Sequence, residues 1–256
     1  MDAVLTAPEP EVEAPVVPLA PVRAVLAMPV GYFVESTTMD SLWRAAARYG
    51  RDQLAYDQED KGDIDKARNI LADRALKRTP RPDYIIFVDH DAGVPIGDPK
   101  WYRRRFGHTL PDRYGRHNFF TRLLAHPPAM GIVGAAYFQR MDGGEAVCSL
   151  GLGGQQKGFS DQLRKGAARG LMPCDWIGFG GTRVALWVLD RLHAEQHRWP
   201  EIISKKNPPR ALGLFNKTMA DVSEDVAFCL RAKTIGIQTY IDCELRLVHT
   251  GKKHYT

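Results

Sequence analysis

The feature that most constrains the fold is a run of five consecutive apolar residues, Tyr84–Val88, which is followed at once by Asp89-His90-Asp91. A strand with one face in solvent alternates polar and apolar residues, whereas a strand inside a parallel sheet is apolar on both faces. A second apolar run, at residues 131–138, indicates another buried strand. Because parallel strands are joined by crossover helices, these runs predict an α/β fold with a mostly parallel central sheet flanked by helices.

Helical segments are predicted between these strands. Residues 63–77 place apolar side chains on one helical face. Residues 37–49 also have helical character, with Ser36 or Thr37 as the expected N-cap. Further helices are expected at residues 114–125, 185–192 and 224–233, further strands at 22–28, 53–56, 238–242 and 246–248, and loops or short strands over 141–173. Ligands of such sheets bind beyond the carboxyl ends of the strands, so functional residues are expected where the strands end.

The amino-terminal segment differs in composition from the rest of the chain. Residues 1–21 consist mainly of Ala, Pro, Glu and Val without an apolar period, so we expect a disordered tail followed by one domain over residues 22–256. The chain carries +5, but the tail holds four acidic and no basic residues, so the remainder, with 35 basic and 26 acidic residues, carries +9. Such a charge suits an anionic ligand, although it would also serve solubility alone.

The sequence also indicates a compartment. The amino terminus has no basic leader, the apolar stretch at residues 15–34 contains four prolines, and the four cysteines show no CxxC spacing. These features predict a cytoplasmic protein without a membrane span or a disulfide framework.

Acidic side chains follow the strand at Tyr84–Val88. Asp89 and Asp91 are two residues apart, and Gly93 and Pro95 supply a turn that would bring the two carboxylates together. Two neighbouring carboxylates at a sheet edge repel each other, and a divalent ion such as Mg²⁺ or Mn²⁺ would relieve that repulsion. The alternative is a solvated acidic turn that binds no metal.

Two single residues have both a functional and an ordinary interpretation. His249 follows the last predicted strand, where an imidazole could complete the coordination of Mn²⁺ or could be an ordinary surface or core histidine. Arg68 lies in the helix predicted over residues 63–77 and could face a phosphate or a base. It could equally be an exposed helical cation.

Two short segments are open to the same two kinds of interpretation. Ser223-Glu224-Asp225 begins a predicted helix, where an acid could act as a general base beside a substrate hydroxyl or could form a capping box with Asp221. The aromatic-glycine loop at residues 176–181 precedes another predicted helix. It could approach a flat ligand closely, or it could pack Trp176 and Phe179 into the core.

The order of these motifs along the chain resembles that of a known enzyme family. An Ala-Arg-Asn helix leads to a strand ending in Asp-x-Asp, then to a GIVGAAY strand, an IGFGG loop, the helix SEDVAFCLRAKTIG, YID and VHTG. Over residues 22–250 the sequence resembles a family 2-type glycosyltransferase of the GT-A fold, and the compact chain is similar to single-domain members encoded by bacteriophages. The resemblance implies a GT-A (Rossmann-like) domain with a nucleotide-diphosphate sugar as donor, UDP as the expected nucleotide and Mn²⁺ or Mg²⁺ as cofactor.

The resemblance also implies roles for individual residues. The metal would be held by Asp89, Asp91 and His249, with Asp91 the more direct of the two carboxylate ligands. Asp225 would be the base that deprotonates the acceptor hydroxyl, with Glu224 as the alternative. The donor nucleotide would contact Pro29, Val30, Gly31, Glu35, Arg68, Asp89 and His90, and the acceptor side would be shaped by Trp176, Gly178, Phe179 and Gly180.

The nature of the transfer follows from what this sequence shares with the family and what it lacks. The QxxRW motif of processive synthases is missing, so transfer of one sugar is expected, with inversion by direct displacement and with retention left open. Some phage-encoded members modify hydroxymethylated pyrimidines in DNA, so double-stranded DNA is one expected acceptor. The basic runs at residues 103–105, 205–206 and 252–253 would suit its phosphate backbone.

Other acceptors and other functions stay open. A glycan, a lipid-linked or a protein acceptor is the alternative to DNA. A nucleotidyltransferase would need a phosphate loop rich in Gly and Lys near the amino terminus, and the sequence GYFVEST at residues 31–37 is not one. A non-catalytic nucleic-acid-binding protein would explain the basic charge but not the placement of the acidic motifs. The sequence indicates no oligomeric state.

Overall fold

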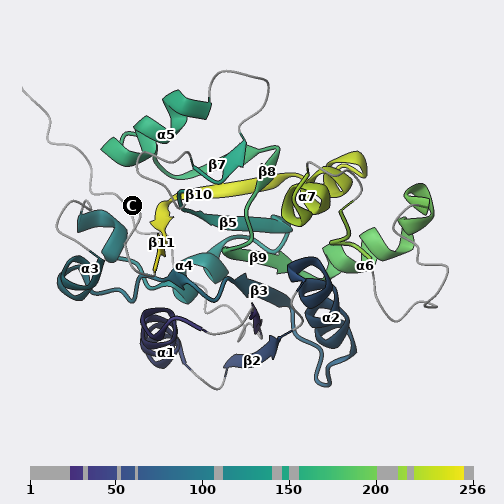
Figure 1. The fold of residues 1–256 in the computed structure, drawn as a ribbon, viewed down its shortest axis with the longest axis horizontal. Coiled ribbons are helices and arrows are strands. Elements are labelled where there is room, and N and C mark those ends of the chain that lie inside the picture. Colours follow the sequence, from purple (N-terminus) through teal and green to yellow (C-terminus); the bar gives the residue numbers. More distant parts are fainter. Residues whose placement is uncertain are drawn as a thin grey trace, which may run out of the picture.

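A computed structural model describes residues 24–30, 34–50, 53–60, 63–106, 112–139, 146–149, 156–200, 213–217 and 222–250 (Figure 1). The expected tail at residues 1–21 lies outside these ranges. The strands are β1 (Ala24–Pro29), β2 (Leu54–Glu59), β3 (Tyr84–Val88), β4 (Ala92–Gly93), β5 (Ile132–Ala136), β6 (Cys148–Ser149), β7 (Leu171–Cys174), β8 (Trp176–Ile177), β9 (Gly181–Ala185), β10 (Thr239–Arg246) and β11 (Val248–His249). The α-helices are α1 (Ser36–Tyr49), α2 (Ile64–Lys77), α3 (Pro99–Phe106), α4 (Phe119–Ala125), α5 (Gln156–Lys165), α6 (Leu186–Ala194) and α7 (Glu224–Thr234), and the 3₁₀ helices are η2 (Asp112–Gly115) and η3 (Gln196–Arg198).

A seven-stranded sheet in the order β2-β1-β3-β9-β5-β10-β7 forms the centre of the molecule. β1 pairs in parallel with both β2 and β3, and β10 pairs in parallel with β5. β9 lies antiparallel between β3 and β5, and β7 lies antiparallel at one edge. Five of the seven strands therefore run in the same direction, which confirms the mostly parallel sheet predicted from the buried apolar runs.

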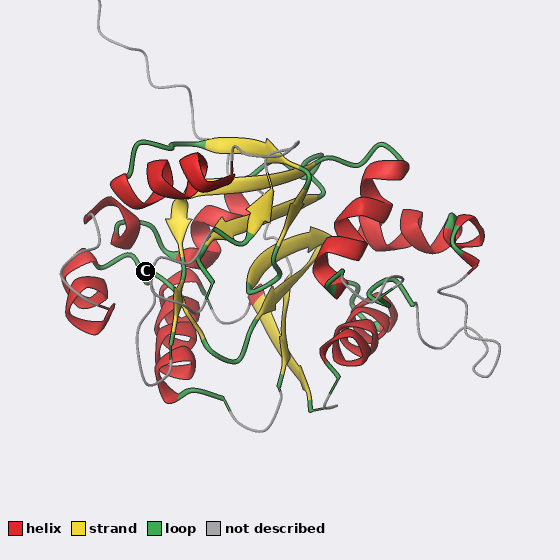
Figure 2. Ribbon diagram, turned by 45° about the horizontal axis from the view of Figure 1, so that its top comes forward, coloured by secondary structure: helices red, strands yellow, loops and turns green. Residues whose placement is uncertain are grey.

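Helices cover both faces of this sheet. Figure 1 and Figure 2 show α2, α6 and α7 on one side and α1, α3 and α4 on the other. β1, β3, β5 and β9 are buried along their whole length, so the core lies on both faces of the central strands. Within the described ranges, no helix has the length and apolar character needed to cross a membrane.

The start of α4 differs from the sequence-based expectation for a physical reason. The helix predicted over residues 114–125 begins only at Phe119. Asn118 is its N-cap, and its Oδ1 accepts hydrogen bonds from the backbone N–H groups of Phe120 (3.0 Å) and Thr121 (3.1 Å). This cap satisfies backbone donors that the first turn of a helix leaves unpaired, and it fixes where α4 begins.

Three further expectations were wrong in detail. The N-cap of α1 is Glu35, not Ser36 or Thr37, and the Glu35 side chain forms no capping hydrogen bond. The aromatic-glycine loop leads into β9 and only then into α6, so it precedes a strand and not a helix. The helices α3 and α5 were not predicted, because α3 buries only Tyr102 and Phe106 and because α5 follows a glycine-rich stretch.

Candidate functional site

Three loops meet at the edge of the sheet where β3 and β5 end and β9 begins. Asp89 follows β3, Tyr137 follows β5 and Gly180 precedes β9. The backbone N–H of Asp89 donates to the carbonyl of Gly180 at 3.3 Å, and the N–H of Gly180 donates to the Tyr137 hydroxyl at 3.1 Å. The Asp-x-Asp turn and the aromatic-glycine loop, which are far apart in the sequence, therefore lie side by side.

Arg68 connects this edge to two helices. It projects from α2, is only 1% exposed, and donates from Nη2 to Asp89 Oδ1 at 2.8 Å. Its Nη1 forms an ion pair with Glu224 Oε1 in the first turn of α7. Its guanidinium carbon lies 5.6 Å from the centre of the Phe179 ring. The expectation of an exposed helical cation is therefore wrong, and one buried side chain joins three of the motifs found in the sequence.

The charges around Arg68 do not balance. Burial opposes the charged guanidinium, but Asp89, Glu224 and Asp225 together raise the pKa of Arg68, so it stays protonated. Burial raises the pKa of Glu224, and the neighbouring Asp225 and Asp89 raise it further against the attraction of Arg68. Three carboxylates facing one guanidinium leave an excess of negative charge. Such surroundings favour the approach of a further cation.

Asp225 lies beside this network at the start of α7. Its Oδ1 accepts hydrogen bonds from the Ser223 hydroxyl and from the backbone N–H of Val226, the latter at 2.8 Å. Both hydrogen bonds that Asp225 accepts from described residues go to Oδ1, which leaves Oδ2 available to take a proton.

The structure describes only part of the segment on which the capping interpretation depends. The N-cap of α7 is Ser223, and its side chain forms no capping hydrogen bond with the helix. Glu224, the other member of the expected capping box, is held by Arg68. Asp221 lies outside the described residues. The two acids of the segment therefore face the sheet edge and are buried there.

The expected metal ligands Asp91 and His249 are brought close by the short sheet of β4 and β11. His249 is the register partner of Ala92, the residue after Asp91. The backbone N–H and the hydroxyl of Thr250 donate to the Asp91 carbonyl at 2.7 Å and 3.0 Å. The His249 ring meets the Tyr137 ring edge to face at 5.1 Å, and both Asp91 and His249 are buried.

The side chains of Asp89, Asp91 and His249 are of the kinds that bind divalent metal ions. Within the described part of the chain, no three His, Cys, Asp or Glu side chains form a group that could hold a metal ion by themselves. The three-ligand set of Asp89, Asp91 and His249 therefore stays a prediction. Mg²⁺ and similar ions bound to nucleotides use one or two carboxylates and take their other ligands from phosphates and water. The excess of carboxylates at this edge fits such a shared site.

The residues expected to contact the donor lie at the end of β1 and beside the Asp-x-Asp turn. Pro29 ends β1, and the N–H of Val30 donates to the Glu59 carbonyl at 2.8 Å. The N–H of Glu35 donates to the His90 carbonyl at 2.9 Å, so the start of α1 is tied to the turn. Gly31 lies outside the described residues.

The aromatic-glycine loop has a packing role that the sequence left open. Phe179 is fully buried and contacts Phe87, Phe215 and Phe228 at ring-centre distances of 5.2–5.6 Å. The interpretation in which the loop packs into the core therefore holds for Phe179, whereas Trp176 is only half-buried. Of the four residues expected on the acceptor side, Phe179 thus faces the core, and an acceptor would not reach it.

The glycines of this loop allow the close approach of Tyr137, a residue that sequence reasoning missed. A Cβ at Gly178 would collide with the Tyr137 hydroxyl, and a Cβ at Gly180 would lie 2.9 Å from its Cζ and 3.2 Å from Asp89 Oδ2. Burial raises the pKa of Tyr137 well above its ordinary value. The signal that could have identified it is its place directly after the buried β5, at the same edge as Asp89.

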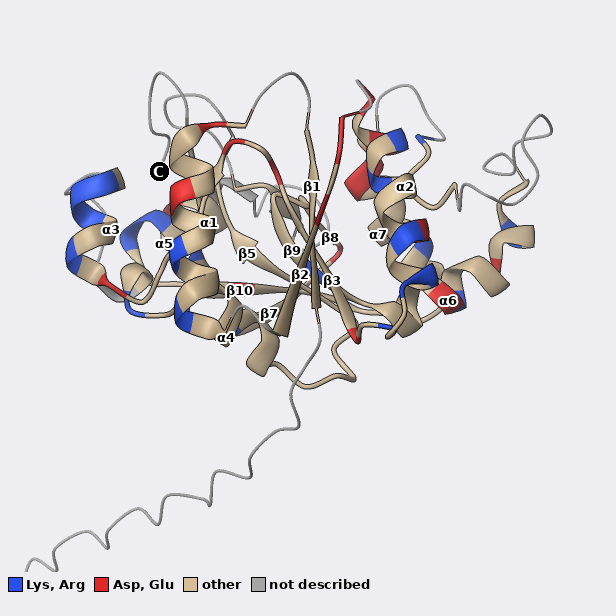
Figure 3. Ribbon diagram, turned by 90° about the horizontal axis from the view of Figure 1, so that it is seen from below, with Lys and Arg blue, Asp and Glu red and all other residues tan. Residues whose placement is uncertain are grey.

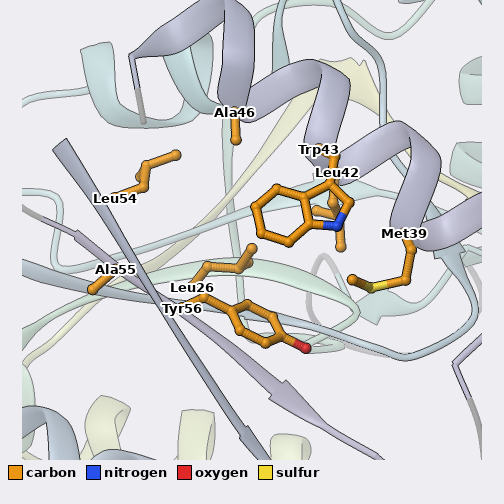
Figure 4. Close-up of a pocket in the computed structure, with 8 residues that line it drawn as sticks. All are labelled: Leu26, Met39, Leu42, Trp43, Ala46, Leu54, Ala55 and Tyr56. Carbon is orange, nitrogen blue, oxygen red and sulfur yellow. The ribbon is translucent and has the colours of Figure 1, made fainter. Parts of the chain in front are cut away.

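A small apolar cavity lies elsewhere and has no part in this site. It has a volume of about 50 Å³ and is enclosed by β1, β2 and α1 (Figure 4). Trp43 and Tyr56 flank it with ring centres 6.2 Å apart, and both rings are partly exposed. None of the expected site residues lines it, and its wall offers almost no polar group that could orient a nucleotide.

Comparisons with known proteins support the fold. The sequence matches no family model and no curated protein. In structure the chain is similar to A197 from STIV, with 15% identity, 90% of this chain and 87% of that chain covered, and a TM-score of 0.52. It also matches a glycosyltransferase involved in the glycosylation of the major capsid of PBCV-1, with 10% identity, 72% and 70% of the two chains covered, and a TM-score of 0.32.

The first similarity shows a shared GT-A-like α/β fold, and the second is too distant to add to it. The fold alone does not establish a reaction, since one fold serves many functions. A functional conclusion must therefore come from the residues at the sheet edge.

Proposed function

We propose that this protein is a metal-dependent glycosyltransferase that moves one sugar from a nucleotide-diphosphate sugar to an acceptor hydroxyl. The observation that carries the proposal is the buried contact of Arg68 with both Asp89 and Glu224. It joins the Asp-x-Asp turn to the acidic start of α7, so the acids that we assign to donor binding and to proton transfer are neighbours at one sheet edge. Ligands of open α/β sheets bind at such an edge.

The donor would occupy the space between β1 and the Asp-x-Asp turn. Asp91 and His249 are the residues proposed to hold Mn²⁺ or Mg²⁺, and Asp89 would assist them with Oδ2, since Arg68 engages its Oδ1. A divalent ion there would stabilise the negative charge that develops on the leaving diphosphate. Arg68 is buried and engaged by two carboxylates, so we assign it the positioning of Asp89 and Glu224 in place of the expected contact with the nucleotide. UDP is the proposed nucleotide.

Asp225 is the proposed general base. The acceptor oxygen attacks the anomeric carbon of the donor, and the bond from that carbon to the diphosphate oxygen breaks. Asp225 takes the hydroxyl proton, and the diphosphate leaves with the electron pair, so the configuration at the anomeric carbon inverts. Ser223 and Val226 orient the carboxylate through Oδ1. A base placed in this way contributes ~10²–10⁴-fold to the rate.

The test is release of nucleoside diphosphate from a panel of nucleotide sugars in the presence of Mn²⁺, with water in the place of the acceptor. We expect release from at least one donor, and release from none would refute the proposed activity. Asp225→Asn should lower the rate by at least ~10²-fold and leave nucleoside diphosphate affinity unchanged.

The matched control is Asp190→Asn, which removes an exposed carboxylate paired with Arg81 on the surface of α6. This variant should be as active as the wild type. If Asp225→Asn also remains within a few-fold of the wild-type rate, the base is not Asp225.

A further inference from the structure

A basic groove lies between the end of α1, the start of α3 and the segment that leads into α4. It consists of two adjoining hollows of about 860 Å³ and 450 Å³, and both are lined by Arg48, Gly97 and Arg116. The larger hollow is lined in addition by Asp98, Pro99, Lys100, Arg103 and Arg104, and the smaller by Ile96, His117, Asn118, Thr121, Arg122 and Ala125.

The larger hollow carries a strong excess of positive charge. Five cationic side chains and one carboxylate line it. That carboxylate, Asp98, is approached by Arg48 at 3.5 Å, while Arg48 also donates to the Ile96 carbonyl at 3.0 Å. The charge of the single acid is therefore already compensated by Arg48, and Lys100, Arg104 and Arg116 gain no partner from it.

Part of the positive charge of the larger hollow has no acidic partner in the described ranges. Among the residues that the structure describes, Lys100, Arg104 and Arg116 form no ion pair. Figure 3 shows Lys and Arg gathered on α3. A surface that leaves several cations without counter-charge is suited to a ligand that brings many negative charges.

The groove leads to the candidate site along α3. This helix begins at the groove with Pro99 and ends at Phe106, whose ring packs directly on the backbone of Gly93 in β4. Arg105 near its end donates to the Thr37 hydroxyl in the first turn of α1. Eight helical residues span ~12 Å. The cations of α3 thus extend from the groove to the first turn of α1 and towards β4, the strand that follows Asp91 and pairs with β11.

We propose that this groove binds the phosphate backbone of a nucleic acid. Each strand of duplex DNA carries one phosphate charge per ~3.4 Å of duplex axis, so a length of axis equal to that of α3 holds three or four phosphates of one strand. A free phosphate or a nucleotide would need only one or two of these cations. An anionic membrane also attracts clustered cations, but firm attachment adds exposed apolar side chains to them. The exposed Trp43, Tyr56, Trp187 and Leu230 do not line the groove.

The groove would bind the nucleic acid whether or not that nucleic acid accepts a sugar. A strand held along α3 would reach the sheet edge, which makes the nucleic acid the acceptor of the transferred sugar. That role rests on the proposed function, whereas the binding does not. Lys100, Arg104 and Arg116 take no part in the proposed chemistry, so their replacement should leave nucleotide-sugar hydrolysis intact.

The experiment measures binding of a fluorescent 30-base-pair DNA duplex by anisotropy from 50 to 200 mM salt. The test variant is Arg104→Ala with Arg116→Ala. The matched control is Arg81→Ala with Arg198→Ala, which removes the same charge from two exposed arginines paired elsewhere with Asp190 and Glu195. Removal of two phosphate contacts should reduce the slope of log affinity against log salt by ~1.8, which makes the loss of affinity over this range about tenfold smaller.

The control variant should keep the wild-type slope. Equal slopes for the test and control variants would overturn the proposal, and so would failure of the wild-type protein to bind the duplex at 50 mM salt. Sedimentation with phosphatidylserine vesicles is run in parallel, and loss of vesicle binding in the test variant with unchanged DNA binding would assign the groove to a membrane surface and also overturn it. Hydrolysis of the nucleotide sugar, measured on the same variants, reports on the proposed activity independently.

Discussion

Replacement of Arg68 by Met tests the physical basis of the site directly. Met keeps an apolar stem of similar length but removes the charge that faces Asp89 and Glu224. Both carboxylates would remain in place at the sheet edge, Glu224 nearly fully buried and Asp89 partly exposed. Removing one partner of a buried ion pair costs about 3–5 kcal/mol, because the remaining charge has no compensation. Since Asp89 keeps some contact with water, we expect the lower end of that range, about 3 kcal/mol at pH 7.

The sign of the pH dependence follows from Glu224. Burial already raises the pKa of Glu224 against the attraction of Arg68, so without Arg68 the folded-state pKa of Glu224 would lie still further above its unfolded value of roughly 4. An acid whose pKa is raised by folding does not reduce the free energy of unfolding below its unfolded pKa. Above that value, the free energy of unfolding falls as the pH rises towards the folded pKa. The destabilisation by Arg68→Met should therefore be small near pH 4 and should grow to its full size by pH 7.

The assay is urea unfolding of the wild type and the variant at several pH values between 4 and 8. The matched control is Arg183→Met, because Arg183 is also buried but donates to the backbone carbonyls of His126, Pro127 and Met130. Its loss should destabilise the protein by an amount that does not depend on pH over this range. An Arg68→Met penalty that is equally independent of pH would refute the reasoning.

Two further changes have defined outcomes. Mn²⁺ should increase the affinity of the wild type for a nucleoside diphosphate, and Asp91→Ala should abolish this increase. Calorimetry with and without a chelator measures both affinities, and equal wild-type affinities under the two conditions would contradict the metal assignment. Asp242→Asn should destabilise the protein by about 3 kcal/mol at pH 7, because Asp242 is buried and accepts from Arg122 at 2.7 Å and 2.9 Å and from His126 at 2.8 Å. Burial opposes the ionisation of Asp242, but these donors hold its pKa below the ordinary value. The stabilisation of the folded state by the ionised Asp242 is therefore present above pH ~4 and is lost as the pH falls through the folded pKa. A urea-unfolding penalty for this variant that persisted unchanged to pH 2 would be the contrary result.

The elements that could be predicted from the sequence are those with a strong local signal. Tyr84–Val88 is apolar throughout and forms β3 within the same bounds. The helical period at residues 63–77 corresponds to α2, and the helix expected at residues 224–233 corresponds to α7. An unbroken apolar run is sufficient to specify β3, and an apolar helical face is sufficient to specify α2.

The elements that could not be predicted depend on long-range contacts. β9 (Gly181–Ala185) is a strand because it fills the place between β3 and β5, and nothing in its own sequence distinguishes it from the start of the next helix. Arg68 resembles any helical cation until the fold places Glu224, which is 156 residues away, within reach of its guanidinium. Tyr137 likewise gains its place only when β5 and β9 become neighbours.

The two aspartates of the Asp-x-Asp turn have different surroundings, and this difference explains how one short turn can serve both sides of the proposed reaction. Asp89 is tied through Arg68 to the acidic start of α7, where the proposed base lies. Asp91 is tied through its carbonyl to Thr250, and hence to the strand that carries His249, where the proposed metal site lies. Because the turn is only three residues long, the position of the base and the position of the metal ligands cannot change independently. A displacement of either α7 or β11 would therefore disturb both groups at once, so Arg68 and Thr250 together set the geometry of the site although neither takes part in the proposed proton transfer.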